Sequence, residues 1–216
     1  MNTPLRLERP QLLTDRVCER IREAIVLGEL KLGEQVSEAQ LAQRMGVSKT
    51  PVREALLRLK GDGLVAVHPQ RGSFVFRLEP DQVGALCRYR ALVETAALRE
   101  SMQAAAEPLA RGMAGCVDEM RRAERKADLQ ALARIDMHFH GLLFEHCPND
   151  YLKAGYEVIR SQLVALRHRS PITNAVASHQ VLVDAVTQGD ADTACLMLSE
   201  HVLENEPRYR IACQLD

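Results

Sequence analysis

Four residues in the C-terminal half of the chain have side chains that suit a transition metal: Asp136, His140, His179 and His201. Asp136 and His140 are one helical turn apart on the apolar face of a predicted helix, and the other two lie on the apolar faces of later predicted helices. A buried carboxylate is costly unless it is paired or metal-bound, and imidazoles suit divalent transition metals. We therefore expect a site for Zn, Ni or Mn with positions left open for water or a ligand.

A second interpretation of the same pattern remains open. A lone inward-facing His is more often a core residue with a satisfied hydrogen bond than a metal ligand. Three of them with an Asp favour a metal, but their spacing does not show that the side chains converge. His138, by contrast, falls on a polar face with Arg134 and Glu145, which predicts a solvated ring.

Arg90 is also unusually placed, because it interrupts an apolar stripe that includes Val83, Leu86 and Ala97. One interpretation is an ion pair within the helix, since Glu94 follows one turn later. The other is that Arg90 points into the domain and binds a carboxylate ligand through its fork of donors.

The segments that carry these residues are predicted to be helices. From Pro80 onward the apolar residues recur at helical spacing, and short polar breaks divide the chain. The predicted helices are 81–106, 109–126, 129–146, 150–169, 172–188 and 190–212. No segment here has the alternation of a strand, so residues 79–216 are expected to form an antiparallel six-helix bundle.

The first 78 residues follow a different pattern and form the other predicted domain. They contain 13 Lys and Arg against 9 Asp and Glu, whereas the remainder contains 15 against 20. Ser37 begins a predicted helix that Gly46 ends, and Ser48 is expected to cap the next helix, with Pro51 in its first turn. After Gly61, the runs "LVAV" and "FVF" flank a turn and predict a hairpin.

This order predicts a winged helix-turn-helix in a mainly α protein, with the second helix in the major groove of DNA. Lys49, Thr50 and Arg53 then lead that helix, and Arg53 can bind a guanine through two hydrogen bonds. Arg71 and Gly72 lie at the tip of the wing, where Gly permits close approach and Arg suits the minor groove. The alternative, a surface helix with solvated bases, does not explain the caps, the turn and the hairpin.

The segments "GELKLGEQVSE", "LAQRMGVSKTPVREALLRLKGDGLV" and "RGSFV" resemble the winged helix-turn-helix of the GntR family of bacterial transcription regulators. The resemblance covers about residues 12–76. It implies DNA contacts by Lys49, Thr50, Arg53, His68, Arg71 and Gly72. Lys49 and Ala39 stand where the family often has Arg, and Lys cannot form the same bidentate fork.

The segments "LCRYRALVETAALR", "DMHFHGLLFEH", "SHQVLVDAV" and "SEHVLE" are similar to the FCD effector domain of that family. A domain of six helices is similar to that of the shorter, vanillate-regulator-like subgroup of the family. The resemblance covers about residues 80–212. It implies that a divalent metal is held by Asp136, His140, His179 and His201. It also implies that Arg90 faces a small carboxylate effector.

These observations predict a homodimeric transcription regulator, by default a repressor, which binds a palindromic double-stranded DNA operator and responds to a small organic acid. Two alternatives remain open: a regulator for which the metal itself is the signal, and a metal-dependent hydrolase with a DNA-binding appendage. Arg90 argues against the first. Against the hydrolase, the sequence contains neither an H-E-x-x-H motif nor a nucleophile elbow, so we expect no enzyme.

The composition, 46% hydrophobic and 26% charged over 216 residues, is that of an ordinary soluble globular protein. Six scattered cysteines without a C-x-x-C pair predict reduced thiols. No segment resembles a signal peptide or a membrane span, so the protein is expected to be cytoplasmic, without a membrane partner.

Overall fold

The computed structural model describes residues 13–170 and 174–214 of the chain. Residues 1–11, for which the sequence predicts a loose arm, and the first two residues of the predicted helix 172–188 lie outside the described residues. The chain divides into two compact units between Phe76 and Arg77, next to the predicted domain limits of 1–78 and 79–216.

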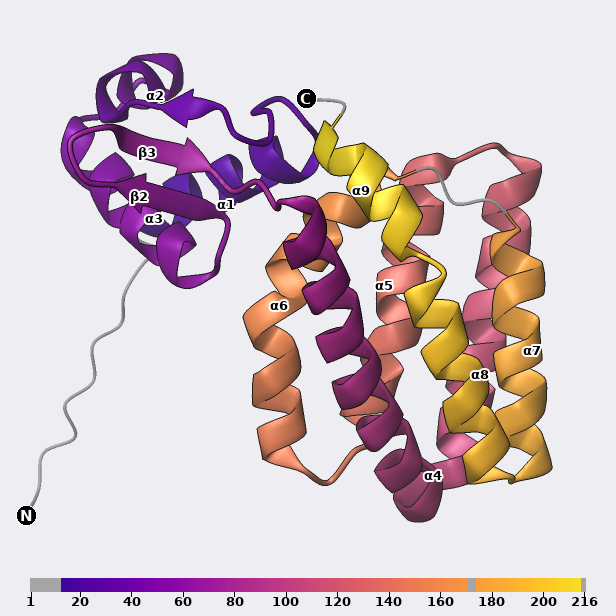
Figure 1. Ribbon diagram of the computed structural model, residues 1–216. Coiled ribbons are helices and arrows are strands. Elements are labelled where there is room, and N and C mark those ends of the chain that lie inside the picture. The colour runs from indigo at the N-terminus through magenta and orange to yellow at the C-terminus, as the bar shows by residue number, and fades with distance from the viewer. Residues whose placement is uncertain (1–12, 171–173, 215–216) are drawn as a thin grey trace, which may run out of the picture. The chain divides into compact units, whose positions relative to one another are not determined.

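The first unit contains helices and short strands in the order of a winged helix-turn-helix (Figure 1). Their bounds are α1 (Leu13–Val26), β1 (Gln35–Val36), α2 (Glu38–Met45), α3 (Lys49–Gly61), β2 (Val65–His68) and β3 (Gly72–Val75). Helix α1 buries Val17, Ile21 and Ile25, which recur at helical spacing, and packs against α3.

Helices α2 and α3 are the pair predicted to form the helix-turn-helix. Ser37 caps α2 as predicted, because its Oγ accepts a hydrogen bond of 3.2 Å from the backbone N–H of Gln40. Gly46 ends α2 in the left-handed conformation, with φ of 66°. Ser48 occupies the N-cap position of α3 but makes no side-chain capping hydrogen bond, so that part of the prediction is wrong. Pro51 lies in the first turn of α3, where a helix needs no N–H.

The predicted hairpin is confirmed, and it is joined by a third strand. β2 and β3 pair antiparallel, with Val65 opposite Val75 and His68 opposite Gly72. β1 pairs with the other edge of β3, which makes the strand order β1-β3-β2. The hairpin is the wing, and the predicted winged helix-turn-helix is confirmed.

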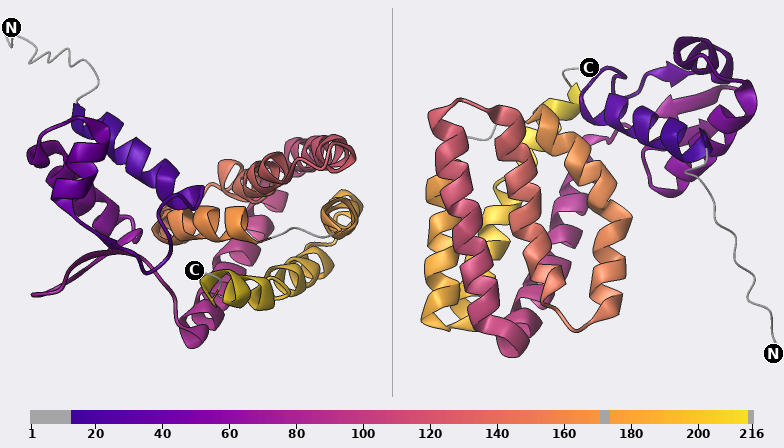
Figure 2. Two further views of the ribbon diagram at one scale, coloured as in Figure 1. Left: turned by 90° about the horizontal axis from the view of Figure 1, so that it is seen from above. Right: turned by 180° about the vertical axis from the view of Figure 1, so that it is seen from behind.

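The second unit is entirely helical in its described residues. Its helices are α4 (Pro80–Arg125), α5 (Leu129–Glu145), α6 (Asp150–Arg169), α7 (Ala175–Gln188), α8 (Ala191–Leu203) and α9 (Glu206–Gln214). They run side by side as a bundle in both views of Figure 2, and α4 packs against every other helix of this unit. Among the described residues, no helix combines the length and apolar character that crossing a bilayer requires.

The chain is divided among these six helices differently from the prediction. The predicted break between residues 106 and 109 is a kink inside α4, where Ala105 has non-helical angles and Pro108 follows. The predicted helix 190–212 is interrupted at Glu204 and Asn205, so that it forms both α8 and α9. As a result, one side chain from the first turn of α9, that of Arg208, lines a cavity beside α8.

Candidate functional site

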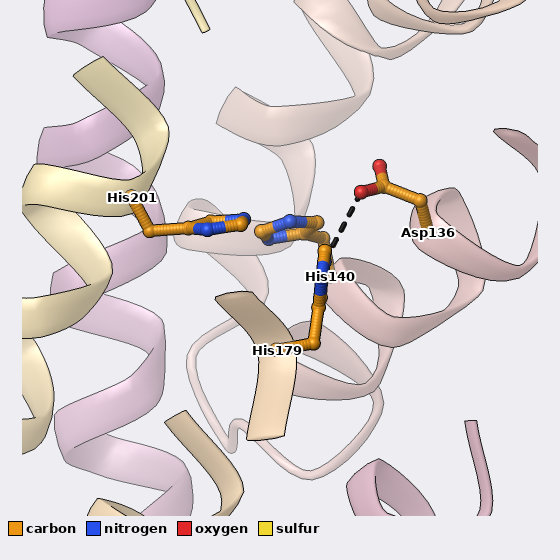
Figure 3. Close-up of side chains that lie close together, drawn as sticks. All are labelled: Asp136, His140, His179 and His201. Atoms are coloured by element: carbon orange, nitrogen blue, oxygen red, sulfur yellow. Dashed lines mark ion pairs between the residues drawn. The ribbon is translucent and has the colours of Figure 1, made fainter. Parts of the chain in front are cut away.

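Asp136, His140, His179 and His201 converge at one buried place in the second unit (Figure 3). The first two come from α5, the third from α7 and the fourth from α8. One possible ligand atom from each residue lies within 4.8 Å of the others, and none of the four residues is more than 9% exposed. Two ligand atoms that bind the same metal at about 2.1 Å are at most about 4.2 Å apart. A small inward shift of the side chains would therefore let one ion contact all four residues.

His179 presents a nitrogen lone pair to this cluster. Its Nδ1 lies 2.8 Å from the carbonyl oxygen of Ala175, and a carbonyl can only accept, so Nδ1 carries the proton. In the neutral ring Nε2 is then unprotonated, and it lies 3.1 Å from Oδ1 of Asp136 (dashed line in Figure 3). Neither Nε2 nor Oδ1 has a hydrogen-bond partner among the described residues. Two lone pairs that face each other at this distance repel, and a shared cation removes the repulsion.

The other two histidines are also chemically suited to a metal. Nε2 of His201 and Nε2 of His140 lack a hydrogen-bond partner within the described part of the chain, which is unusual for buried polar atoms. Burial lowers the pKa of His140 to about 4 and lowers the pKa of His201 as well. Both rings are therefore neutral at pH 7, which is the form that binds metals.

Glu94 of α4 connects His140 to Arg90. The Glu94 carboxylate lies 2.8 Å from Nδ1 of His140 and accepts a hydrogen bond of 2.6 Å from Nε of Arg90. All three residues are fully buried. Burial raises the pKa of Glu94, but Arg90 and His140 outweigh that effect and hold the pKa at about 2. A carboxylate in this place favours a proton on Nδ1 and leaves Nε2 of His140 available to a metal.

Arg167 of α6 is the corresponding partner of Asp136. Its Nε lies 2.9 Å from Oδ2 of the carboxylate. Burial opposes ionisation of Asp136, yet the guanidinium of Arg167 holds its pKa well below the ordinary value. The two carboxylates, Asp136 and Glu94, are thus balanced by the guanidiniums of Arg167 and Arg90. A divalent metal at the cluster would therefore add two positive charges that these four groups do not offset.

A cavity of about 260 Å³ opens beside the cluster. It is lined by Asp136, Asn174, Ser178, His179, His201, Glu204, Asn205 and Arg208. Three of the four cluster residues thus border a space in which a small molecule can reach them. Arg208, from α9, supplies a cation on its wall.

Arg90, which the sequence predicted to face a carboxylate ligand, is not among the residues that line this cavity. Its Nε is bound by Glu94, and its Nη1 donates a hydrogen bond of 3.2 Å to the hydroxyl of Tyr209. The structure therefore contains the intrahelical ion pair that the sequence left open as an alternative, and that pair is fully buried. A ligand-binding role for Arg90 stays a prediction.

Three charged residues near the cluster were not predicted as part of the site. Arg167 carried a sequence signal, because it shares the buried stripe of α6 with Leu163 in the way that Arg90 shares the stripe of α4. Glu94 was predicted only as a partner of Arg90, and its contact with another helix had no signal. Arg208 had none either, since it reaches the cavity only because the chain breaks before α9.

The residues predicted to contact DNA lie in two places on the first unit. Lys49, Thr50 and Arg53 are exposed at the start of α3, while Ala55 and Leu56 on the same helix are buried. Helix α3 is thus held by its apolar face and leaves these three side chains free of the core.

The other predicted contacts lie at the tip of the wing, where His68, Arg71 and Gly72 are exposed. Gly72 has φ of 99°, a conformation that residues with a side chain rarely adopt, and a Cβ added there would lie 3.2 Å from Nε2 of Gln35, so glycine is favoured at this position. Nε2 of Gln35 donates a hydrogen bond of 2.8 Å to the carbonyl of Arg71. The Arg71 guanidinium lies 5.8 Å from the ring centroid of Phe74. These contacts support the conformation of the chain at the tip of the wing.

The matches to known families follow the same division of the chain. Residues 13–75 match the bacterial regulatory proteins of the gntR family, and residues 85–204 match the FCD domain. The chain is 33% identical to an uncharacterized HTH-type transcriptional regulator of Streptomyces ambofaciens over 85% of this chain and 79% of that protein. It is 26% identical to the HTH-type transcriptional repressor RspR of Escherichia coli K12 over 94% of this chain and 92% of the repressor.

Solved structures share the fold. A GntR transcriptional regulator from Rhodococcus sp. RHA1 matches with a TM-score of 0.73 at 22% identity, covering 91% of this chain and 96% of that one. E. coli McbR/YncC matches with a TM-score of 0.71 at 20% identity, covering 94% and 98% of the two chains. With both of its units matched in order, the chain belongs to the GntR family of bacterial transcriptional regulators and carries an FCD domain.

Proposed function

We propose that this regulator is a repressor that binds a palindromic operator as a homodimer and is released by a small organic acid held at a metal centre. The observation that carries the proposal for the metal centre is the unpartnered pair of Asp136 Oδ1 and His179 Nε2 beside an open cavity. Repression is supported by the likeness to a relative named as a repressor. Release requires that the acid bind the DNA-bound and the free arrangement with different affinity, with a typical coupling of about 1–3 kcal/mol.

The charge of the cluster supports an anionic ligand. Asp136, His140, His179 and His201 would hold the metal, which would supply a Lewis acid for a carboxylate oxygen. Because the buried carboxylates and guanidiniums already balance, an anion would offset the charge that the metal adds. The volume of about 260 Å³ restricts the ligand to a small acid, and Arg208 on the cavity wall can meet a second anionic group.

A second copy of the chain is proposed to cover the face formed by α4 and α8. On these helices Leu92 and Leu196 are 70% and 61% exposed, and Leu203 is 38% exposed. These three leucines line a shallow, mainly apolar groove with Ala91 and Thr95. Exposed apolar side chains that gather on one face are typical of subunit interfaces. A symmetric pair would present two copies of α3 to two half-sites of an operator.

Thermal unfolding of metal-loaded and chelated protein tests the effector proposal. The panel contains small mono- and dicarboxylates, sugar acids and aromatic acids. A ligand at a hundred times its dissociation constant stabilises the folded protein by about 2.7 kcal/mol, which gives a readable shift. We expect at least one acid to raise the unfolding temperature, and only in the metal-loaded protein.

The other outcomes of this experiment are equally informative. Stabilisation by Zn, Ni or Mn without any effect of an acid would favour a regulator for which the metal is the signal. No stabilisation by metal or acid would mean that the four residues form a polar core, and the effector proposal would then be wrong. Neither result would bear on the DNA-binding unit.

Replacement of Arg53 tests the proposed DNA contacts. Arg53→Ala is expected to reduce the preference for an operator over an unrelated duplex by roughly 5- to 150-fold, because a bidentate contact to one base is lost. The measurement is duplex binding at fixed salt, with an operator selected from a random library by the wild-type protein. Arg58→Ala is the matched control, since Arg58 is also exposed on α3 and ion-paired, to Asp15. An unchanged preference in Arg53→Ala would remove Arg53 from base recognition.

A further inference from the structure

Arg53 is held by a carboxylate from the preceding helix. Glu38, the first residue of α2, meets it side-on: Nε lies 3.0 Å from Oε1 and 3.1 Å from Oε2, and Nη2 lies 2.8 Å from Oε2. The Arg53 side chain is 61% exposed and that of Glu38 is 34% exposed, so the pair lies at the surface of the unit.

This contact uses only one edge of the guanidinium. The donors that face Glu38 are the Nε hydrogen and the hydrogen of Nη2 on the same side. The second hydrogen of Nη2 and the hydrogens of Nη1 belong to the other edges, and Nη1 makes no hydrogen bond within the described residues. The edge between Nη1 and Nη2 carries two parallel N–H groups, which match O6 and N7 of a guanine. Glu38 and a guanine can therefore bind the same guanidinium at once.

The helix pair gives Glu38 a fixed position from which to act. The cap at Ser37 sets the start of α2, and α2, which buries Leu41, packs against α3. An exposed Arg otherwise samples many rotamers, and that freedom is lost when it binds a base. A partner that already holds the side chain in the unbound protein lowers this entropic cost.

The chemistry of the neighbouring residues makes the position of Arg53 important for specificity. Lys49 and Thr50 lack the planar fork that recognises one base through two hydrogen bonds.

The hydrogen bond from Arg53 lowers the pKa of Glu38, and Lys49 adds to that effect, so Glu38 is ionised at neutral pH. Its negative charge also lies close to where DNA phosphates would approach, which weakens binding to every sequence alike.

We infer that Glu38 is a positioning residue for base recognition. It binds the edge of the Arg53 guanidinium formed by Nε and Nη2, so that the edge formed by Nη1 and Nη2 is presented to a guanine. The inference rests on the proposed role of Arg53 in contacting a base. Glu38 then raises the discrimination between sequences while it lowers the affinity for DNA in general.

The test uses the full-length protein and a duplex selected from a random library by the wild type. In matched duplexes, each guanine in turn is replaced by 7-deazaguanine, which lacks the N7 acceptor. At the guanine contacted by Arg53, the substitution should reduce the affinity of the wild type about 10-fold or more and leave the affinity of Arg53→Ala unchanged. The ratio of the affinity for the guanine duplex to that for the 7-deazaguanine duplex is then about 10 or more in the wild type and about 1 in Arg53→Ala. Glu38→Gln and Glu38→Ala should reduce that 10-fold ratio to about threefold or less. Their affinity for an unrelated duplex should stay equal or increase.

Asp15→Asn is the matched control, because it removes one negative charge from a partly exposed carboxylate that pairs with Arg58 of α3. It should leave the ratio unchanged. In the double variant of Glu38→Ala and Arg53→Ala, the ratio should equal that of Arg53→Ala alone. Circular dichroism confirms that each variant is folded.

Three results would overturn the inference, and they are distinguishable. If Arg53→Ala removes the sensitivity to 7-deazaguanine but both Glu38 variants retain it, Arg53 reads the base without help and only the role of Glu38 is wrong. If no guanine depends on Arg53, the proposed contact of Arg53 fails together with the role of Glu38. Stronger operator binding by Glu38→Gln at an unchanged ratio would mark Glu38 as a competitor of the DNA.

Discussion

Replacing His179 by Ala is expected to reduce the affinity for a divalent metal by at least about 100-fold. His179 supplies the nitrogen whose lone pair is directed at the cluster by the hydrogen bond to Ala175. Loss of a residue that only hydrogen-bonds to a metal ligand reduces metal affinity by about 10- to 100-fold, and removal of the ligand itself reduces it further. Binding of the acid should weaken as well, because the metal would hold it. The measurement is calorimetric titration of the chelated protein with Zn²⁺, Ni²⁺ and Mn²⁺.

His138→Ala is the control for this experiment. His138 lies on α5 between Asp136 and His140, but it is exposed, so its loss should leave metal affinity unchanged. DNA binding without acid should persist in His179→Ala, because α3 and the wing belong to the other unit. If DNA binding disappeared with the metal, the metal would be structural and the effector proposal would be wrong. Unchanged metal affinity in His179→Ala would exclude the cluster as the metal centre.

Arg90→Met should lower the free energy of unfolding of the helical unit by about 3–5 kcal/mol, since it leaves the carboxylate of Glu94 buried without its ion-pair partner. The unfolding temperature should fall by roughly 6–20 °C, read by circular dichroism in the chelated protein so that metal binding plays no part. This expectation follows from the contacts of Arg90 with Glu94 and Tyr209. If Arg90 instead served mainly to bind a ligand, its loss would weaken acid binding with little change in stability.

Arg99→Met provides the comparison on the same helix. Arg99 pairs with Asp192 at 2.6 Å, but the two side chains are 46% and 85% exposed, so losing this pair should cost less than about 1 kcal/mol. Adding Glu94→Gln to Arg90→Met should recover part of the stability, because the uncompensated buried charge is then removed. A loss below about 1 kcal/mol in Arg90→Met would contradict a structural role for the pair with Glu94.

The amino-acid sequence by itself determined which side chains face inward. Side-chain direction along a helix follows from the helical period, so the burial of His140, His179 and His201 could be predicted from local spacing. The cap at Ser37 and the hairpin that forms the wing are also local, because each depends on a few consecutive residues. For the same reason the fold class and the winged helix-turn-helix could be predicted without knowing any contact between helices, whereas the extent of α4 and the break between α8 and α9 were not predicted.

Only the tertiary structure decided which of these inward side chains meet. Helical spacing predicts the contact of Glu94 with Arg90 on the same helix, but not its contact with His140 on another. The hydrogen bond from Arg90 to Tyr209 joins residues 119 positions apart, and no pattern in either segment requires it. Such contacts depend on how the helices pack, and the packing follows from their full surfaces rather than from the period of any one helix. The convergence of the four cluster residues and the place of Glu38 beside Arg53 were decided in this way.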